Sequence, residues 1–322
     1  MATPSETALL VNYSPNRRNP HAYNPQRLDE HQPEQYIQIL HRLKLHWLEY
    51  TVGWVCALPL EMAAAKGMLD QVHPNLAEQD DADHNSYVLG QVQGHNVDLL
   101  RTFKSIRFGL MVGIGGGAPS QSQKQDIRLG DIVYDRGKTV QDGEFQRTGS
   151  LNAPPQVLLA GLSRLQADHP VEDSMIPQFL EELVSKSPKK MKKKFSHQGA
   201  ANDHLFHAGY GHVNLDSTCE QCCDRSDGTD PVSHYGNIAS GNQVIKDAKM
   251  RDRLSRELGV LCFEMEAAGL QDFPCLVIRG ICDYADSHKN KNWQGYAAAT
   301  AAAFAKELLS VIPPTRVLRR SP

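Results

Sequence analysis

Acidic residues follow several predicted strands, and their side chains could carry acid–base chemistry. Glu264 and Glu266 come directly after one apolar strand, and Asp283 comes just after another. A glycine-rich turn is predicted over 113–117, at the end of a third strand. Ligands of open α/β sheets bind outside the carboxyl ends of the strands, and glycine lets the backbone approach a ligand closely. The pattern predicts that these groups line one crevice.

Each of these acids also has an ordinary structural explanation when it is considered alone. An aspartate after a strand is more often a turn or helix-capping residue than a catalyst. Glu61, Glu264 and Glu266 could be acids at helix starts, where the helix dipole stabilises them. The ordered combination, rather than any single residue, favours a functional site.

The elements that must position these residues alternate along the chain. Pro59 in a first helical turn and Glu61 just after it are favoured at a helix start. Alternation of this kind predicts an α/β fold, with three α/β/α layers around a central mixed sheet in one domain. Strands are predicted over 51–57, 86–92, 95–100, 108–112, 131–134, 237–240, 261–263 and 275–281, and helices over 59–70, 156–167, 176–186, 247–258, 264–272 and 296–311. A surface loop is predicted for the basic run 187–194, and solvated surface for 286–291.

Composition sets limits on the partners and the compartment. The chain has 322 residues, 40% hydrophobic and 22% charged, with a net charge of −3, which is ordinary for a soluble globular protein. The mild acidity gives no reason to expect nucleic acid as a partner, and no apolar stretch is long enough to span a bilayer. The first residues lack the pattern of a secretory peptide. Seven cysteines, several in apolar segments, favour reduced thiols and a cytoplasmic location.

Six segments, in this order, resemble the nucleoside phosphorylase/hydrolase family, and most closely the branch found in filamentous fungi. They are VGWVCALPLEMAAA, GLMVGIGGGAP, LGDIV, GNIASGNQVI, CFEMEAAGL and VIRGICDYAD. The resemblance covers 51–313, which we predict to be one nucleoside phosphorylase/hydrolase domain. Residues 1–50 are predicted to be a disordered or partly helical leader, and 314–322 a basic tail.

The resemblance implies a purine nucleoside N-ribohydrolase that cleaves the N-glycosidic bond to the free base and ribose. This reaction needs a proton for the leaving base and stabilisation of a cationic sugar, which usually calls for two carboxyl groups with different duties. Asp283 matches the family's aspartate that donates a proton to N7 of the purine. Glu266 matches the glutamate that binds the ribose 2′ and 3′ hydroxyls, and Met265 matches the residue that packs on the sugar.

The same resemblance extends the substrate site to neighbouring residues. Val244 and Ile245 match the segment that meets the base. The turn that lines the ribose and the nucleophile matches Gly113, Ile114, Gly115 and Gly116. Phe263 and Glu264 complete the predicted substrate site. Apart from the resemblance, Arg279 is predicted to be structural and to anchor one of the acids, with a contact to the substrate as the alternative.

Glu61 bears on the choice between hydrolysis and phosphorolysis. Phosphorylases of this family typically carry an arginine at this position, which grips phosphate, whereas the family's hydrolases carry an acid that orients and deprotonates water. A carboxylate would repel a phosphate dianion, so Glu61 favours the hydrolase. The alternatives are a purine nucleoside phosphorylase with inorganic phosphate as co-substrate, and a non-catalytic nucleoside-sensing domain of the kind that precedes nucleotide-binding and repeat regions in fungal receptor-like proteins.

Two family segments are shortened here, which we interpret as internal deletions. One gap lies between Val97 and Ser105, where too few residues remain for a parallel crossover helix; the other follows Val133. The pair Cys219 and Cys222 has a zinc-like spacing, but a second pair is missing, so we expect no metal site and no cofactor. We expect a purine nucleoside or related small molecule as ligand, a homo-oligomer, and no nucleic-acid or membrane partner.

Overall fold

The structure of the chain is a computed structural model. The structure describes residues 49–74, 88–99, 106–120, 125–135, 153–209, 222–223, 230–241, 244–270 and 273–314. All of them belong to one compact unit, His46–Pro322. The predicted leader up to residue 48, the basic tail beyond Pro314 and Cys219 lie outside these residues. Both predicted deletions border on segments that are not described, so they stay predictions.

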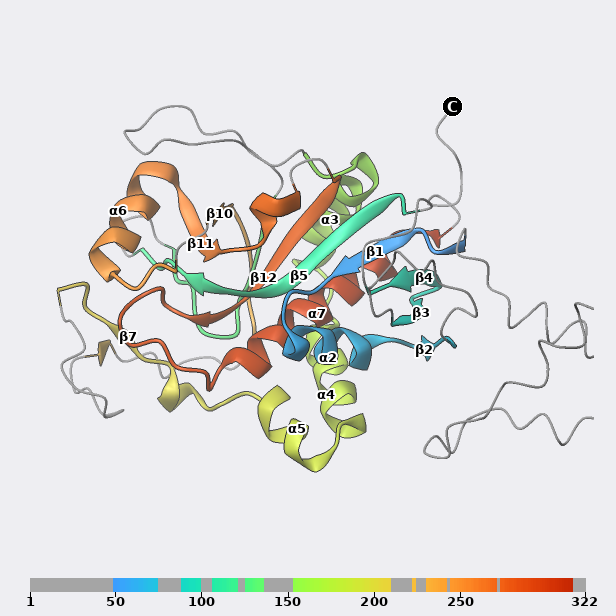
Figure 1. Cartoon of the computed structure of the whole chain (residues 1–322), viewed down its shortest axis with the longest axis horizontal. Coiled ribbons are helices and arrows are strands. Elements are labelled where there is room, and N and C mark those ends of the chain that lie inside the picture. The colour runs from blue at the N-terminus through green and yellow to red at the C-terminus, as the bar shows by residue number, and fades with distance from the viewer. Residues whose placement is uncertain are drawn as a thin grey trace, which may run out of the picture. The chain divides into compact units, whose positions relative to one another are not determined.

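A mixed sheet forms the centre of this unit, which confirms the predicted fold class (Figure 1). The strand order is β2-β3-β4-β1-β5-β12-β6-β9, and β11 pairs with both β5 and β10. Its central strands β1, β5 and β12 run parallel to one another, whereas β6 and β11 run antiparallel to their neighbours β12 and β5. The strands are β1 (Val52–Val55), β2 (Gln71–Val72), β3 (Leu89–Val92), β4 (His95–Asp98), β5 (Phe108–Gly117), β6 (Ile132–Asp135), β9 (Ser233–Tyr235), β10 (Asn237–Ser240), β11 (Val260–Glu264) and β12 (Cys275–Asp283). A separate pair is formed by β7 (Leu205–Phe206) and β8 (Cys222–Cys223).

One face of the sheet is covered by helices that gather around α7 (Gln294–Ser310). Because α7 is rich in alanine, its backbone comes close to β12, where Gly280 lies directly beneath Ala297. Figure 1 shows α2, α4 and α5 on the side of the sheet where α7 lies. The helices packed against α7 are α2 (Pro59–Met68), α3 (Gln156–Asp168), α4 (Ile176–Lys186) and α5 (Lys189–Phe195).

The opposite face is covered by shorter elements. Met111 of β5 and Val277 of β12 pack there against Ala267, which lies in the 3-10 helix η5 (Ala267–Leu270). The helix α6 (Ala248–Leu258) packs on β11. The alternation of side chains along β12 explains this division, since Leu276 and Ile278 belong to the core around α7.

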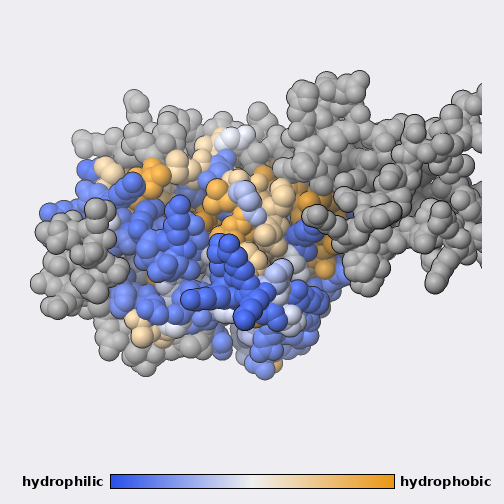
Figure 2. Space-filling view, turned by 60° about the horizontal axis from the view of Figure 1, so that its bottom comes forward, coloured by the Kyte–Doolittle hydropathy of each residue, from blue (hydrophilic) through white to orange (hydrophobic). Residues whose placement is uncertain are grey.

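Three local predictions were wrong. The predicted glycine turn over 113–117 is the second half of strand β5, because the missing Cβ atoms leave room for neighbouring side chains. The predicted helix over 264–272 begins instead as strand β11, and its helical part in the described chain is η5. The predicted surface loop over 187–194 contains helix α5, whose Phe195 is buried while its lysines are exposed. Figure 2 shows the largely hydrophilic surface on this side of the molecule.

No helix in the described part of the chain is both long enough and apolar enough to cross a membrane.

Candidate active site

A buried arginine, Arg279 on β12, organises the candidate site. Its side chain is 1% exposed, and its Nη2 donates hydrogen bonds to Oε2 of Glu264 and, at 3.2 Å, to Oε2 of Glu266. A Cβ atom added at Gly113 would lie 2.5 Å from Oε1 of Glu61 and closer still to Nη1 of Arg279. The absent side chain at Gly113 therefore makes room for one guanidinium beside three carboxylates. The predicted anchoring role of Arg279 is confirmed.

Glu61 is fixed by backbone amides from two different elements. Its Oε2 accepts hydrogen bonds from the N–H groups of Ala57 and Leu58, at 2.9 and 2.8 Å, in the connection between β1 and α2. Its Oε1 accepts one from the N–H of Ile114 on β5, at 2.9 Å. Pro59 starts the helix, and Glu61 is buried in its first turn. The carboxylate is thus held at the point where β1, α2 and β5 meet.

Glu264 is the structural acid of the pair that faces Arg279. It accepts hydrogen bonds from the N–H groups of Glu266 and Ala267, at 3.1 and 3.0 Å, and so stabilises the start of η5. Burial alone would raise the pKa of Glu264, but the Arg279 guanidinium and hydrogen bonds from Ser240 and Ala267 outweigh it and hold the pKa below its usual value. Glu264 therefore stays ionised.

Glu266 is the more accessible of the two acids. Its side chain is 35% exposed, and the neighbouring Met265 is 43% exposed, so both can meet a ligand. Burial raises the pKa of Glu266, Arg279 opposes this, and the charge of Glu264 adds to the increase, so that the pKa lies above its ordinary value. The pKa values of these two glutamates thus shift in opposite directions, because Glu264 makes the closer contact with the Arg279 guanidinium.

Asp283 ends β12 directly opposite Gly116 of β5. Its Oδ1 accepts a hydrogen bond from the N–H of Ala285 at 2.9 Å and lies 3.1 Å from Nζ of Lys289. Its Oδ2 accepts a hydrogen bond from the Cys282 thiol at 3.4 Å. Ala285 has a φ of 49°, in the left-handed region, which turns the chain sharply after the strand.

The loop after Asp283 is held by residues from distant parts of the chain. Arg251 on α6 donates from Nη1 to the carbonyl oxygen of Tyr284 at 2.8 Å, and the Tyr284 hydroxyl donates to Asp203. Sequence reasoning missed Arg251 and Lys289, and its prediction that 286–291 is solvated surface was wrong at Asp286, which is buried. Nothing in the local pattern reveals these partners, because they depend on how α6 and this loop pack.

The residues predicted to meet the base are only partly brought together. Phe263 pairs with Gly116 and packs with Ala285 in a small cluster, and Ile245 packs against the same cluster. Val244 is exposed and lies outside it. The group formed by Arg279 with Glu61, Glu264 and Glu266 is called the Arg279 cluster below. Along β5, the site thus runs from this cluster, beside Gly113, to Asp283, opposite Gly116.

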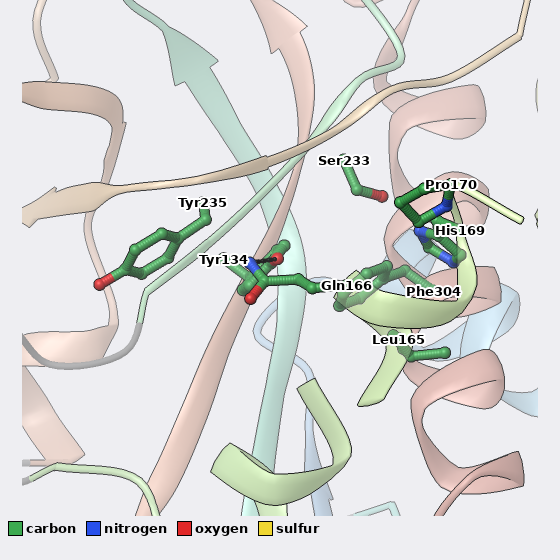
Figure 3. Close-up of a pocket in the computed structure, with 8 residues that line it drawn as sticks. All are labelled: Tyr134, Leu165, Gln166, His169, Pro170, Ser233, Tyr235 and Phe304. Atoms are coloured by element: carbon green, nitrogen blue, oxygen red, sulfur yellow. Dashed lines mark hydrogen bonds between the residues drawn. The ribbon is translucent and has the colours of Figure 1, made fainter. Parts of the chain in front are cut away.

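A separate groove of about 330 Å³ lies elsewhere in the molecule (Figure 3). None of the predicted site residues lines it. Its walls come from β6, β9, α7 and the end of α3, and the residues are Tyr134, Leu165, Gln166, His169, Pro170, Ser233, Tyr235 and Phe304. The convergent charged groups lie at the Arg279 cluster and Asp283, so we place the candidate site there and not in the groove.

Metal chemistry has no candidate ligands in the described residues, where no group of three or more His, Cys, Asp or Glu side chains is placed to hold an ion. Cys56, Cys262, Cys275 and Cys282 are buried thiols that form no disulfide bond. Burial raises the pKa of Cys56, Cys262 and Cys282 well above its ordinary value, so these thiols are unreactive at neutral pH.

Comparison with known proteins gives two informative sequence matches, while no family model matches the chain. A nucleotide-binding leucine-rich repeat (NLR)-like protein of Hyaloscypha variabilis is 44% identical over 300 residues, which cover 83% of this chain. The chain spans about 30% of the length of that relative. A 5′-methylthioadenosine/S-adenosylhomocysteine nucleosidase of Mycobacterium bovis is 26% identical over 82% of this chain and 97% of its own length.

Among solved structures, the chain is similar to a Borrelia burgdorferi B31 protein described as the same type of nucleosidase and bound to adenine. The TM-score is 0.50 at 13% sequence identity, and the match covers 80% of this chain and 98% of that one. At this level of identity the likeness concerns the fold.

Proposed function

We propose that the chain is a member of the nucleoside phosphorylase/hydrolase superfamily and that it hydrolyses the N-glycosidic bond of a purine nucleoside, or of a related purine ribosyl compound. The products are the free base and a ribose with its C1′ hydroxyl. The observation that carries the proposal is the charge of the site, where Glu61, Glu264 and Glu266 surround the single guanidinium of Arg279.

This charge balance favours water over phosphate as the nucleophile. Three carboxylates against one arginine leave an excess of negative charge, and a phosphate dianion placed beside Gly113 would be repelled by Glu61. A neutral water molecule pays no such penalty and can donate a hydrogen bond to a carboxylate. Phosphorolysis, which transfers the ribosyl group to inorganic phosphate, is therefore the weaker candidate.

The chemistry divides between the two ends of the site. The C1′–N9 bond breaks, its electron pair goes to the purine, and Asp283 gives a proton to N7. Water attacks the cationic C1′ and loses a proton to Glu61. The enzyme is restored when Glu61 releases this proton to solvent and Asp283 takes one up, so water and nucleoside become ribose and base with no other reactant. The carboxylate set around Arg279 also stabilises the positive charge that develops on the sugar.

The substrate contacts come from residues near β5. Glu266 and Met265, which are both accessible, take the ribose hydroxyls and the sugar face, while Phe263 and Ile245 supply apolar surface for the base. The Mycobacterium relative is named for 5′-methylthioadenosine and S-adenosylhomocysteine, so both belong in the substrate panel.

The test is base release by the purified chain from adenosine, inosine, guanosine, 5′-methylthioadenosine and S-adenosylhomocysteine, with and without inorganic phosphate. Release without phosphate supports the proposal. Release that requires phosphate identifies a phosphorylase and contradicts the assigned role of Glu61.

A second candidate function is nucleoside sensing without turnover, which is favoured by the 44% identity to an NLR-like protein that is much longer than the matched part. In that case the same residues would bind a purine nucleoside and release it intact. Calorimetric binding of a nucleoside that is never cleaved would identify this function.

We also propose a cytoplasmic location, a homo-oligomeric assembly and a reaction without metal or organic cofactor. The buried thiols, which form no disulfide bond, support a reducing compartment. Light scattering on the purified chain tests the assembly, and base release in the presence of a chelator tests the absence of a metal. A monomer, or activity abolished by the chelator, would contradict the corresponding proposal.

A further inference from the structure

Lys289 places a positive charge directly on the candidate acid. Its Nζ lies 3.1 Å from Oδ1 of Asp283, and the two side chains are 26% and 12% exposed. An ion pair this sheltered from water is screened less than a surface pair. Lys289 comes six residues after Asp283, so the loop between them must fold back for this contact to form.

Several contacts hold the loop between Asp283 and Lys289 in this conformation. The ring of His288 stacks on Phe206, with centroids 3.8 Å apart and an interplanar angle of 18°, and the backbone N–H of His288 donates to Oδ1 of Asp286 at 2.8 Å. Arg251 holds the start of the same loop through the Tyr284 carbonyl. Lys289 is therefore presented from an anchored position, whereas Lys291, two residues later, is exposed.

We propose that Lys289 is a positioning residue for the acid step, and that its ammonium stabilises the negative charge that develops on Asp283 as the proton passes to the leaving purine. The inference rests on the proposed function. In the step, the C1′–N9 electron pair moves to the purine, the Asp283 proton moves to N7, and the carboxylate that remains is the one paired with Lys289. A fixed charge aimed at developing charge needs no reorganisation during the reaction.

Among the described residues, the other side chain that contacts the Asp283 carboxylate is the thiol of Cys282, which donates to Oδ2 at 3.4 Å. Burial raises the pKa of this thiol, so it stays protonated and adds no charge beside Asp283. The effect of Lys289 should therefore appear in the rate of the acid step and not in the binding of the substrate.

The experiment compares kcat and KM, at one neutral pH, for the wild type, Lys289→Met, Lys289→Arg and the control Lys291→Met. We expect Lys289→Met to lower the maximal kcat about 10- to 100-fold. We expect KM to stay within about threefold of the wild type, because Lys289 contacts the acid and not the substrate. Lys289→Arg, which keeps the positive charge, should restore most of the wild-type kcat, and Lys291→Met should match the wild type in both constants. Equal melting temperatures for the four proteins exclude misfolding as the cause.

If the kcat of Lys289→Met matches that of Lys291→Met, the inference is overturned, while base release by the wild type leaves the proposed function standing. A rise in KM with an unchanged kcat overturns it as well, because Lys289 would then act in binding. If the wild type releases no base, the proposed function fails and the inference fails with it.

Discussion

In the proposed reaction, the proton for the leaving base comes from Asp283. Asp283→Asn keeps the size of the side chain but removes the transferable proton. Because a positioned general acid contributes about 10²- to 10⁴-fold, we expect base release to fall by that factor while adenine binding, measured by calorimetry, stays within a few-fold of the wild type. Near-wild-type turnover by this variant would remove Asp283 from the mechanism.

Glu266 should act on the sugar and not on the base. In Glu266→Gln the contact to the ribose hydroxyls weakens, so we expect a larger loss of kcat/KM for adenosine than for 2′-deoxyadenosine, by about tenfold. Steady-state kinetics on the two substrates measure this ratio. The same loss for both substrates would show that Glu266 does not bind the 2′ hydroxyl.

At the scale of residues, the acids that follow strands could be predicted from the sequence. Most of the basic side chains that hold them and the loop after Asp283 could not. Asp283 and Glu264 can be recognised in the sequence because a carboxyl group after a buried strand must be either solvated or paired with a polar partner. Arg279 was placed correctly beside an acid, whereas Lys289 and Arg251 were missed. Their roles depend on a folded-back loop and on helix α6, which no local spacing encodes.

At the scale of elements, the closest approach lies between α7 and β12. A Cβ atom at Gly280 would overlap the carbonyl oxygen of Ala297, and helix backbone cannot move aside cheaply. We expect Gly280→Ala to lower the free energy of unfolding by about 2 to 3 kcal/mol, measured by urea denaturation. Gly269→Ala is the matched control, because a Cβ there meets nothing within 4 Å. Equal stability of the two variants would contradict the packing of α7 on β12.

Apolar patterning predicted most of these elements, and the exceptions have physical causes. The helix predicted over 176–186 matches α4 at both ends, and the strand over 237–240 matches β10. The glycines of β5 favour a turn in the sequence because glycine is common in turns. In the structure they let neighbouring side chains pack closely against the strand. Helix α5 was missed because repeated lysines suggest a solvated loop, and burial of Phe195 decides otherwise.

At the scale of the whole molecule, His95 ties β4 to the end of α7. Its Nε2 atom lies 2.8 Å from the carbonyl oxygen of Ile312 and 3.2 Å from that of Leu309. The N–H group at Nε2 thus donates to carbonyl groups at the C-terminal end of the helix. Burial lowers the pKa of His95 below its ordinary value of 6.5, although both carbonyl contacts oppose this, and burial also lowers the pKa of His73 and His197.

Histidines with a lowered folded-state pKa make stability depend on pH in a defined direction. Below about pH 6.5 the unfolded chain binds protons that the folded chain does not, so the free energy of unfolding should fall as the pH drops from 7.5 to 5.5. His95→Gln keeps a donor for the helix end but cannot titrate, so its loss of stability over this range should be smaller. Parallel denaturation curves for the two proteins at both pH values would refute this role of His95.

The central claim is that water attacks C1′ and that Glu61 accepts its proton, and isotope labelling tests it most directly. The purified chain is incubated with its best nucleoside substrate in water enriched in ¹⁸O, with phosphate present, and the ribose product is reduced at once to prevent exchange before mass spectrometry. The account predicts one ¹⁸O atom in the sugar, and a loss of this product by at least about 100-fold in Glu61→Gln, whose amide cannot take the proton. Ribose 1-phosphate without the label would contradict the attack by water. An undiminished amount of labelled ribose from Glu61→Gln would contradict the role of Glu61.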